Sequence, residues 1–163
     1  MTVTQATDFD RFFRAEFPRL VTAAAALTGS REVAKEVAQE SMLRAYREWR
    51  RVSSLDIPAA WVRRVAINLA IDRSRRVKRE RAALSRAGHG SETVTLADEF
   101  DTVWEAVRRL PGRQREIVVL RYVYDLPVAE IAATLEIATG TVTASLHKAR
   151  RTLAAALGSE ELR

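Results

Sequence analysis

Apolar residues recur every three or four positions along nearly the whole chain, which predicts helices and favours an all-α protein. No run of alternating β-branched residues indicates a strand, and only four prolines and six glycines interrupt the pattern. In the N-terminal half we expect helices over residues 9–28, 31–50 and 58–81, with a loop at 51–57. Gly29 suits the end of the first helix, Ser30 the cap of the second, and Pro58 the first turn of the third.

The composition changes after the third predicted helix. The stretch SRAGHGSETVT at 85–95 has two glycines and no strong periodicity, which is typical of a flexible linker, and His89 within it is expected to be solvated. Helical spacing resumes near Asp98 and Phe100, stops at 110–112, and continues in a further helix over 113–122. We therefore predict two small helical domains, residues 1–84 and 98–163, joined by a flexible linker at 85–97.

Residues 128–157, VAEIAATLEIATGTVTASLHKARRTLAAAL, predict two helices joined by a tight turn. The first helix offers Ile131, Ala132 and Leu135 for packing, and Ile137 offers an apolar plug in the turn. On a helical wheel the second helix has one apolar stripe, formed by Val142, Leu146, Ala149, Leu153 and Ala156. The opposite side of the same helix carries Ala144, His147, Lys148 and Arg151. This is the pattern of a helix-turn-helix, whose second helix enters the DNA major groove.

The charge of the chain favours a polyanionic partner. The formal net charge is +6, and the segment 73–86 carries seven basic residues against the single acid Glu80. Such a segment suits contacts with several phosphates and salt-dependent binding. A solvated helix end is the alternative interpretation of the same charges.

The residue types present argue against catalysis, a bound metal or a cofactor. Cysteine is absent, only two histidines occur, and the chain has neither a GxxxxGK[ST] loop nor a paired acid cluster for a metal-bound nucleotide. The longest apolar stretch, residues 20–27, is too short to span a bilayer, and Asp8 and Asp10 do not fit a signal peptide. We expect a cytoplasmic protein that binds its partners without membrane insertion and is not an enzyme.

Three stretches in this order resemble the sigma factors of bacterial RNA polymerase, specifically the short two-domain extracytoplasmic-function group of the sigma-70 family. They are AKEVAQESMLRAYREW, WVRRVAINLAIDRSRR and LPGRQREIVVLRYVYDLPVAEIAATLEIATGTVTASLHKARRTL. The resemblance covers nearly the whole chain. It implies core RNA polymerase and promoter DNA as partners, with the β′ clamp helices and the β flap as the polymerase surfaces that are bound.

The resemblance implies that the helix at 31–50 binds the β′ clamp helices, with Glu36, Gln39 and Glu40 as polar contacts. An exposed amphipathic face without a partner is an equal alternative from the residues alone. Lys35 and Glu36 stand where the family usually has Glu and Asp. A lysine in place of an acid is expected to weaken contact with a basic partner surface.

The helix at 58–81 and the loop at 52–57 are implied to bind the downstream promoter element and to open DNA. Asn68 lies at the border of the apolar stripe, which consists of Trp61, Val62, Val65, Ala66 and Leu69. The resemblance implies that Asn68 helps to hold a base flipped out of the non-template strand. The alternative is that its side chain forms a local hydrogen bond on the helix surface. The residues implied to contact phosphates are Arg63, Arg64, Arg73, Arg75 and Arg76. Trp61 belongs to the same set of DNA-binding candidates, although its spacing favours a place in the core over a base-stacking platform.

The resemblance implies that the last helix binds the upstream promoter element, through Thr141, Thr143, Ala144, His147, Lys148 and Arg151. Thr143 and Ala144 depart from the family, which commonly has Lys or Arg and Ser there, and their methyl groups suit thymine better than guanine. His147 is alternatively an ordinary surface residue. Glu136 replaces the usual turn glycine, which costs stability if that position needs a positive φ.

Two other functions remain open at this stage. A stand-alone transcriptional regulator needs only the helix-turn-helix, and an interaction module binds polymerase or an inhibitor without opening promoters. The N-terminal domain argues against the stand-alone regulator, because a regulator has no need of it. Lys35 is the residue that supports the interaction module. An anti-sigma protein is a further partner that only the resemblance implies.

Overall fold

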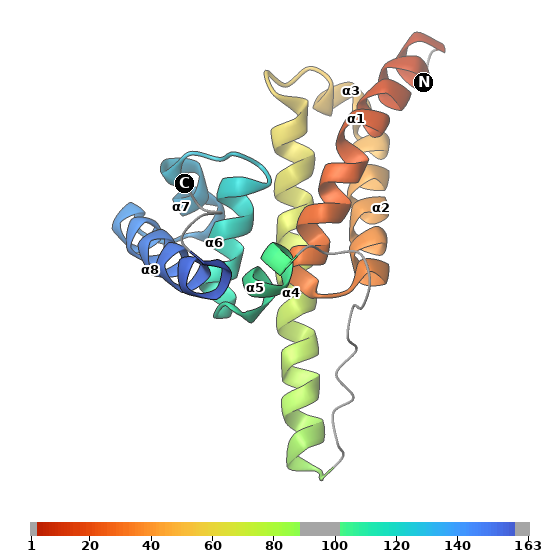
Figure 1. Ribbon diagram of the computed structural model, residues 1–163. Helices are drawn as coiled ribbons and strands as arrows, with labels where there is room; N and C mark the ends of the chain where they lie inside the picture. The colour runs from red at the N-terminus through yellow and green to blue at the C-terminus, as the bar shows by residue number, and fades with distance from the viewer. Residues whose placement is uncertain (1–2, 89–101, 159–163) are drawn as a thin grey trace. The chain divides into compact units, whose positions relative to one another are not determined.

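The computed structural model describes residues 3–88 and 102–158, which form eight α-helices and contain no strand (Figure 1). The all-α prediction is therefore confirmed for the described part of the chain. The chain divides into two compact units, Met1–Thr93 and Val94–Arg163.

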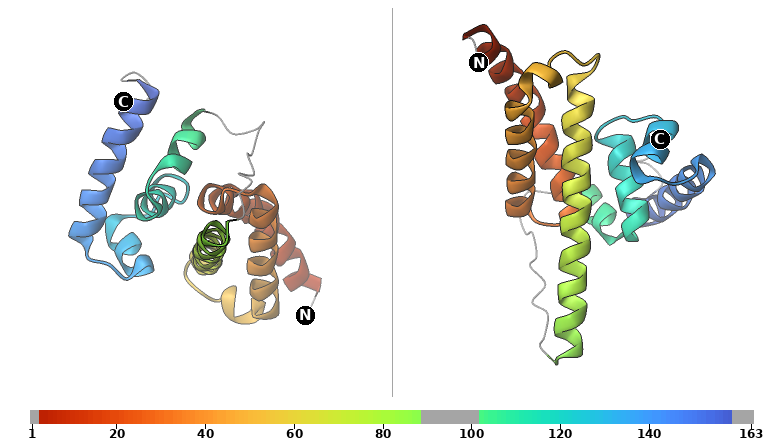
Figure 2. Two further views of the ribbon diagram at one scale, coloured as in Figure 1. Left: turned by 90° about the horizontal axis from the view of Figure 1, so that it is seen from below. Right: turned by 180° about the vertical axis from the view of Figure 1, so that it is seen from behind.

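The first unit consists of three long helices and one short one: α1 (Val3–Thr28), α2 (Arg31–Arg47), α3 (Trp49–Val52) and α4 (Pro58–Arg86). The three long helices pack side by side, each against the other two (Figure 2). Their core combines large side chains such as Leu20, Val37 and Val62 with a run of alanines at 23–26. Because alanine is small, it lets neighbouring helices approach closely, and the unit needs few large residues to fill its interior.

Local signals set the junction between α1 and α2 as expected. Gly29 has φ +72° and donates its N–H to the carbonyl of Ala25 at 2.8 Å, which ends α1. Ser30 Oγ accepts the N–H of Val33 at 3.3 Å and caps α2. Both predictions are confirmed.

The later helix boundaries differ from the predicted ones. α2 ends at Arg47 instead of residue 50, and the chain then forms the short α3, so the loop begins at Ser53. α4 continues to Arg86, and Ser85 and Arg86 are helical instead of belonging to a linker. The extension follows from its composition, since Arg, Lys, Glu, Ala and Leu are strong helix formers. The remainder of the predicted linker with His89, and the predicted helix start at Asp98, fall largely outside the described residues.

The buried face of α4 is rotated from the predicted stripe. Val62 and Ala66 are buried as expected, whereas Trp61, Val65 and Leu69 are only half-buried. The other buried residues of α4 are Ile67, Ala70 and Ile71. α4 packs against both α1 and α2, so its buried face points between these two helices, and no periodicity within α4 reveals that direction.

The second unit contains α5 (Thr102–Arg109), α6 (Gly112–Tyr122), α7 (Val128–Leu135) and α8 (Thr139–Leu157). α8 packs against the other three helices, and the core includes Ile117, Leu120, Ile131 and Val142. The tight turn between α7 and α8 confirms the predicted helix-turn-helix. Ala156 is exposed, contrary to prediction, because the last turn of α8 extends beyond Leu153, the last residue that its neighbours bury.

Over residues 3–88 and 102–158, no helix is both long and apolar enough to cross a bilayer, and no cluster of His, Asp and Glu could hold a metal ion.

Candidate nucleic-acid and polymerase interfaces

The six residues predicted to read the upstream element lie exposed on α8, and we call them the upstream face: Thr141, Thr143, Ala144, His147, Lys148 and Arg151. The opposite side of α8 is anchored in the core by Val142, Leu146 and Ala149. Packing on one side therefore fixes which side of the helix is available to a partner. The predicted separation of the two sides of α8 is confirmed, while the contacts of the individual residues stay a prediction.

Thr143 presents its methyl group rather than its hydroxyl. The hydroxyl donates to the backbone carbonyl of Thr139 at 3.1 Å, one turn earlier in α8. The methyl group and the neighbouring Ala144 leave this part of the upstream face apolar. Such a surface suits the methyl group of thymine in the major groove.

Arg150 holds α8 to α6 instead of joining the upstream face. Its Nε donates to the hydroxyl of Tyr122 at 2.7 Å, and its guanidinium lies 5.9 Å from the centre of the Tyr122 ring. Within the described ranges, Lys148 and Arg151 have no such partner and no ion pair. Of these basic residues, Lys148 and Arg151 are therefore the ones available to phosphates.

The turn before α8 contains a residue with a positive φ, as considered for Glu136 from the sequence. Glu136 has φ +55° and ψ 47°, in the left-handed region that glycine adopts most easily. The N–H of Ile137 donates to the carbonyl of Ala132 at 3.0 Å, and the half-buried Ile137 fills the turn as expected.

Asn68 lies exposed on α4 and shares one side of the helix with four other residues. We call this set the strand face: Trp61, Arg64, Asn68, Asp72 and Arg75. The side-chain amide of Asn68 forms no hydrogen bond with the described part of the protein. The alternative of a local hydrogen bond is therefore not what the structure shows, and the amide is available to a base.

Arg63 points away from the strand face and is a structural residue. Its guanidinium binds the carboxylate of Glu16 twice, Nε to Oε2 at 2.9 Å and Nη2 to Oε1 at 2.8 Å. The two side chains are only 17% and 11% exposed. The structure therefore pairs Arg63 within the first unit, where α1 supplies its counter-charge, and does not leave it exposed beside the other residues predicted to contact phosphate.

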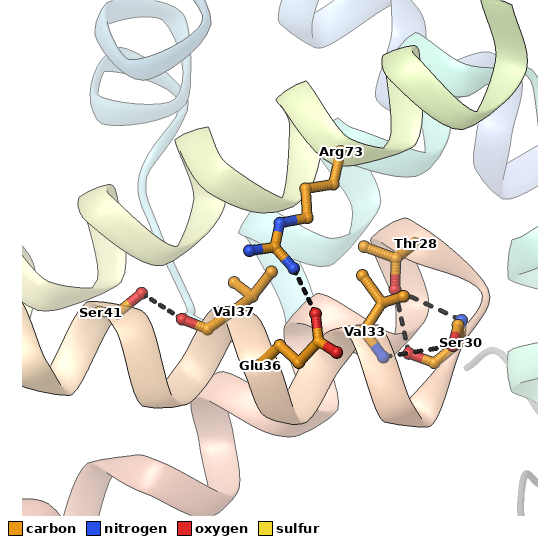
Figure 3. A network of polar contacts seen from close by, with 7 residues as sticks. All are labelled: Thr28, Ser30, Val33, Glu36, Val37, Ser41 and Arg73. Carbon is orange, nitrogen blue, oxygen red and sulfur yellow. Dashed lines mark hydrogen bonds and ion pairs between the residues drawn. The ribbon is translucent and has the colours of Figure 1, made fainter. Parts of the chain in front are cut away.

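Arg73 joins two predicted interfaces. Its Nη1 lies 2.6 Å from Oε2 of Glu36, so a predicted phosphate contact on α4 pairs with a predicted polymerase contact on α2 (Figure 3). The side chains are 38% and 57% exposed, which makes the pair weak enough for either partner to be released. Arg76 similarly pairs with Glu80, 3.0 Å away, along the exposed part of α4.

The exposed side of α2 includes an apolar residue that the sequence analysis missed. Glu36 and Gln39 are exposed, and the half-buried Glu40 pairs with Arg44 at 2.8 Å. Leu43 lies on the same side, 42% exposed, and we call Glu36, Gln39, Glu40 and Leu43 the docking face. Leu43 lies seven residues, or two helical turns, after Glu36, and this spacing is the signal that could have identified it.

The loop at 53–57 presents apolar side chains next to the strand face. Leu55 and Ile57 are exposed, although both are large and hydrophobic. Trp61, predicted to be in the core, is half-buried, and the guanidinium of Arg51 lies 5.5 Å from the centre of its ring. Trp61 is therefore partly accessible on the strand face, with the guanidinium of Arg51 over one face of its ring.

Comparisons with known proteins agree with this arrangement. The family model "Sigma-70 region 2" matches residues 12–80, and the model "Sigma-70, region 4" matches residues 100–153. The ECF RNA polymerase sigma factor SigM of Mycobacterium tuberculosis (strain H37Rv) is 30% identical over 151 residues, which covers 92% of this chain and 77% of SigM. The chain belongs to the ECF group of sigma-70 family sigma factors.

Other sigma factors are similar over most of the chain. SigW of Bacillus subtilis (strain 168) is 29% identical over 147 residues, covering 78% of this chain and 76% of SigW. The RNA polymerase sigma-E factor of Streptomyces avermitilis is 27% identical over 157 residues, covering 95% of this chain and 88% of that factor. The solved sigma factor RpoE, in complex with the anti-sigma factor NepR from Bartonella quintana, has the same fold, with a TM-score of 0.73, 22% identity, and coverage of 94% and 99%.

The family assignment argues against one of the two alternatives left open, the stand-alone regulator. The region 2 match contains the docking face and the strand face, and the region 4 match contains the upstream face. A stand-alone regulator does not account for region 2. The relatives are sigma factors and not enzymes.

Proposed function

We propose that this sigma factor docks on core RNA polymerase through the docking face and opens promoter DNA by capturing unstacked non-template bases on the strand face. The upstream face then fixes the other end of the promoter. The observation that carries the proposal is the exposed amide of Asn68, which lies between Arg64 and Arg75 on one side of a region 2 helix.

Polymerase docking is supported by the chemistry of α2. Glu36 and Gln39 offer polar contacts around the exposed Leu43, a combination typical of interfaces, where an apolar anchor is surrounded by polar residues. The partner surface that we propose for it is the coiled coil of the β′ clamp helices, and the β flap is proposed for the second unit. Lys35 lies exposed beside the docking face and is expected to lower the affinity for a basic surface.

Strand opening is proposed to draw on binding energy alone. Capture of an unstacked base contributes about 1–3 kcal/mol, so one or two captured bases and their phosphates offset the opening of a few base steps. Asn68 would pair with a base edge that only unstacked DNA exposes, and Arg64 and Arg75 would hold the adjacent phosphates. The loop at 53–57, with the exposed Leu55 and Ile57, would complete the base pocket.

An anti-sigma partner is also proposed, and its support comes from one similar solved structure. The relative RpoE from Bartonella quintana was solved with the anti-sigma factor NepR. An inhibitor that covers the exposed Leu43 of the docking face would prevent polymerase from binding there.

Run-off transcription with bacterial core RNA polymerase and a promoter library tests the proposal as a whole. We expect start sites that core polymerase alone does not use. In the same assay, Asn68→Ala should impair formation of the open complex far more than initial promoter binding. The control Arg19→Ala, at an exposed position of α1 outside the proposed faces, should not. An equal loss of both steps in Asn68→Ala would contradict the role of Asn68 in strand capture.

A further inference from the structure

A hollow of about 560 Å³ lies between α6 and α8, at the edge of the upstream face. The residues that line it are Gln114, Lys148, Arg151, Thr152 and Ala155. Lys148 and Arg151 also belong to the upstream face. The hollow therefore continues that face from α8 toward the first turn of α6, which carries Gln114.

The side-chain oxygen of Gln114 is not satisfied within the protein. Its Oε1 is buried and has no hydrogen-bond partner. Buried polar atoms are nearly always hydrogen-bonded, so this exception indicates that a donor lining the hollow, Lys148 or Arg151, turns toward Oε1 when a ligand binds. A side-chain amide offers an acceptor and two donors, which lets it accept from a cation and donate to an anion at the same time.

The charges around the hollow favour an anion. Lys148 and Arg151 are exposed, and no acidic residue lines the hollow. The hydroxyl of Thr152 donates to the carbonyl of Lys148 at 3.1 Å, so that threonine contributes mainly its methyl group. The nearby Arg113, by contrast, pairs with Glu116 at 2.9 Å. Two cations and one amide are thus left to hold a negatively charged group.

The position of the hollow favours a DNA phosphate over a base. A helix in the major groove has a sugar-phosphate backbone on each side, so groups at the edge of its reading face meet phosphates. Lys148 and Arg151 lie at that edge, one and two turns from Ala144 along α8.

We propose that the hollow receives one backbone phosphate of the promoter duplex beside the upstream element, and that Gln114 contacts this phosphate together with Lys148 and Arg151. The amide NH₂ of Gln114 donates to a phosphate oxygen, while its Oε1 accepts from one of the two cations. The site adds a contact from α6 to those made by α8, and it rests on the proposed role of the upstream face.

Two variants of Gln114 test the contact in the full chain assembled with core polymerase on a promoter selected from a library. Gln114→Met keeps the length of the side chain and removes the amide, and it should weaken promoter binding about tenfold, equally for the selected upstream element and for base-substituted ones. Gln114→Glu keeps the acceptor but adds a negative charge, and it should weaken binding more. Unchanged thermal unfolding of both variants excludes a folding defect as the cause.

Promoters with a single neutral methylphosphonate locate the phosphate. At one position beside the upstream element, the methylphosphonate should weaken binding of the wild type about tenfold but should hardly weaken binding of Gln114→Met any further. At other positions, the loss caused by the methylphosphonate and the loss caused by Gln114→Met should multiply. Losses that multiply at every methylphosphonate position would overturn the phosphate site. A loss of polymerase binding by Gln114→Met in the absence of DNA would also overturn it, because the residue would then belong to a polymerase-binding surface. If wild type shows no preference for the selected upstream bases, the proposed role of the upstream face fails instead.

Discussion

Arg63 on α4 and Glu16 on α1 form a two-point ion pair, with Nε and Nη2 of the arginine 2.9 and 2.8 Å from the two carboxylate oxygens. Arg64, the next residue, is exposed on the strand face. A turn of about 100° between successive helical residues thus separates a structural arginine from a candidate phosphate contact. The same substitution should therefore affect stability at Arg63 and promoter binding at Arg64.

Arg63→Met should lower the free energy of unfolding by about 3 kcal/mol, because it leaves the Glu16 carboxylate nearly buried without its partner. Arg64→Met should change it by no more than about 0.5 kcal/mol, yet reduce the salt dependence of promoter binding by about one unit of slope. Urea unfolding and binding at several salt concentrations measure these effects. In the double variant Arg63→Met/Glu16→Leu most of the lost stability should return, and equal stabilities of Arg63→Met and Arg64→Met would contradict the assignment.

Glu136→Gly should stabilise the second unit by about 1 kcal/mol, because Glu136 has φ +55° and glycine adopts this region without the penalty of a Cβ atom. Glu136→Ala is the matched control, since it removes the charge but retains Cβ, and it should give no comparable gain. Thermal unfolding followed by circular dichroism measures both. A gain in Glu136→Ala as large as that in Glu136→Gly would show that charge, not backbone conformation, limits stability here.

Thr143→Val should preserve the base preference at the upstream element, because the threonine hydroxyl is bound to the Thr139 carbonyl and the methyl group is what DNA meets. Thr143→Ser keeps the hydroxyl and loses the methyl group, and it should reduce discrimination for thymine by about 1 kcal/mol. Binding to a set of upstream elements that differ at single base pairs measures the discrimination. The opposite ranking of the two variants would mean that the hydroxyl reads the base.

Leu43→Ala should weaken binding to core RNA polymerase by about 1 kcal/mol or more, since an exposed leucine on the docking face is a candidate apolar anchor. Leu84→Ala removes a similarly exposed leucine from α4 and serves as the control. A titration of labelled sigma factor with core polymerase gives both affinities. Equal affinities of wild type and Leu43→Ala would place the polymerase contact elsewhere.

Sequence patterns predicted the features that depend on neighbours along the chain. Gly29 and Ser30 act within one turn of helix, and the two sides of α8 follow from its own periodicity. The helix-turn-helix and the exposure of Asn68 and of the whole upstream face were therefore accessible to the sequence. Even the strain at Glu136 could be anticipated from its place in the turn.

Contacts between distant residues were not accessible in this way. Which side of α4 faces the core depends on α1 and α2, and the rotated stripe with Ile67 and Ile71 could not be derived from α4 alone. For the same reason the sequence could not show that Gln114 borders a hollow with residues of α8.

The amino-acid sequence by itself determined the helices, their caps and the existence of a basic, DNA-directed surface, because hydrophobic periodicity, capping and charge act over a few residues. Only the tertiary structure decided which of the arginines on α4 are paired with other helices of the protein. Arg63 is paired with a carboxylate 47 positions away and Arg73 with one 37 positions away, while Arg64 faces solvent. The physical reason is that a charge takes its role from the groups that folding brings within a few ångströms, and for Arg63 and Arg73 those groups lie on other helices.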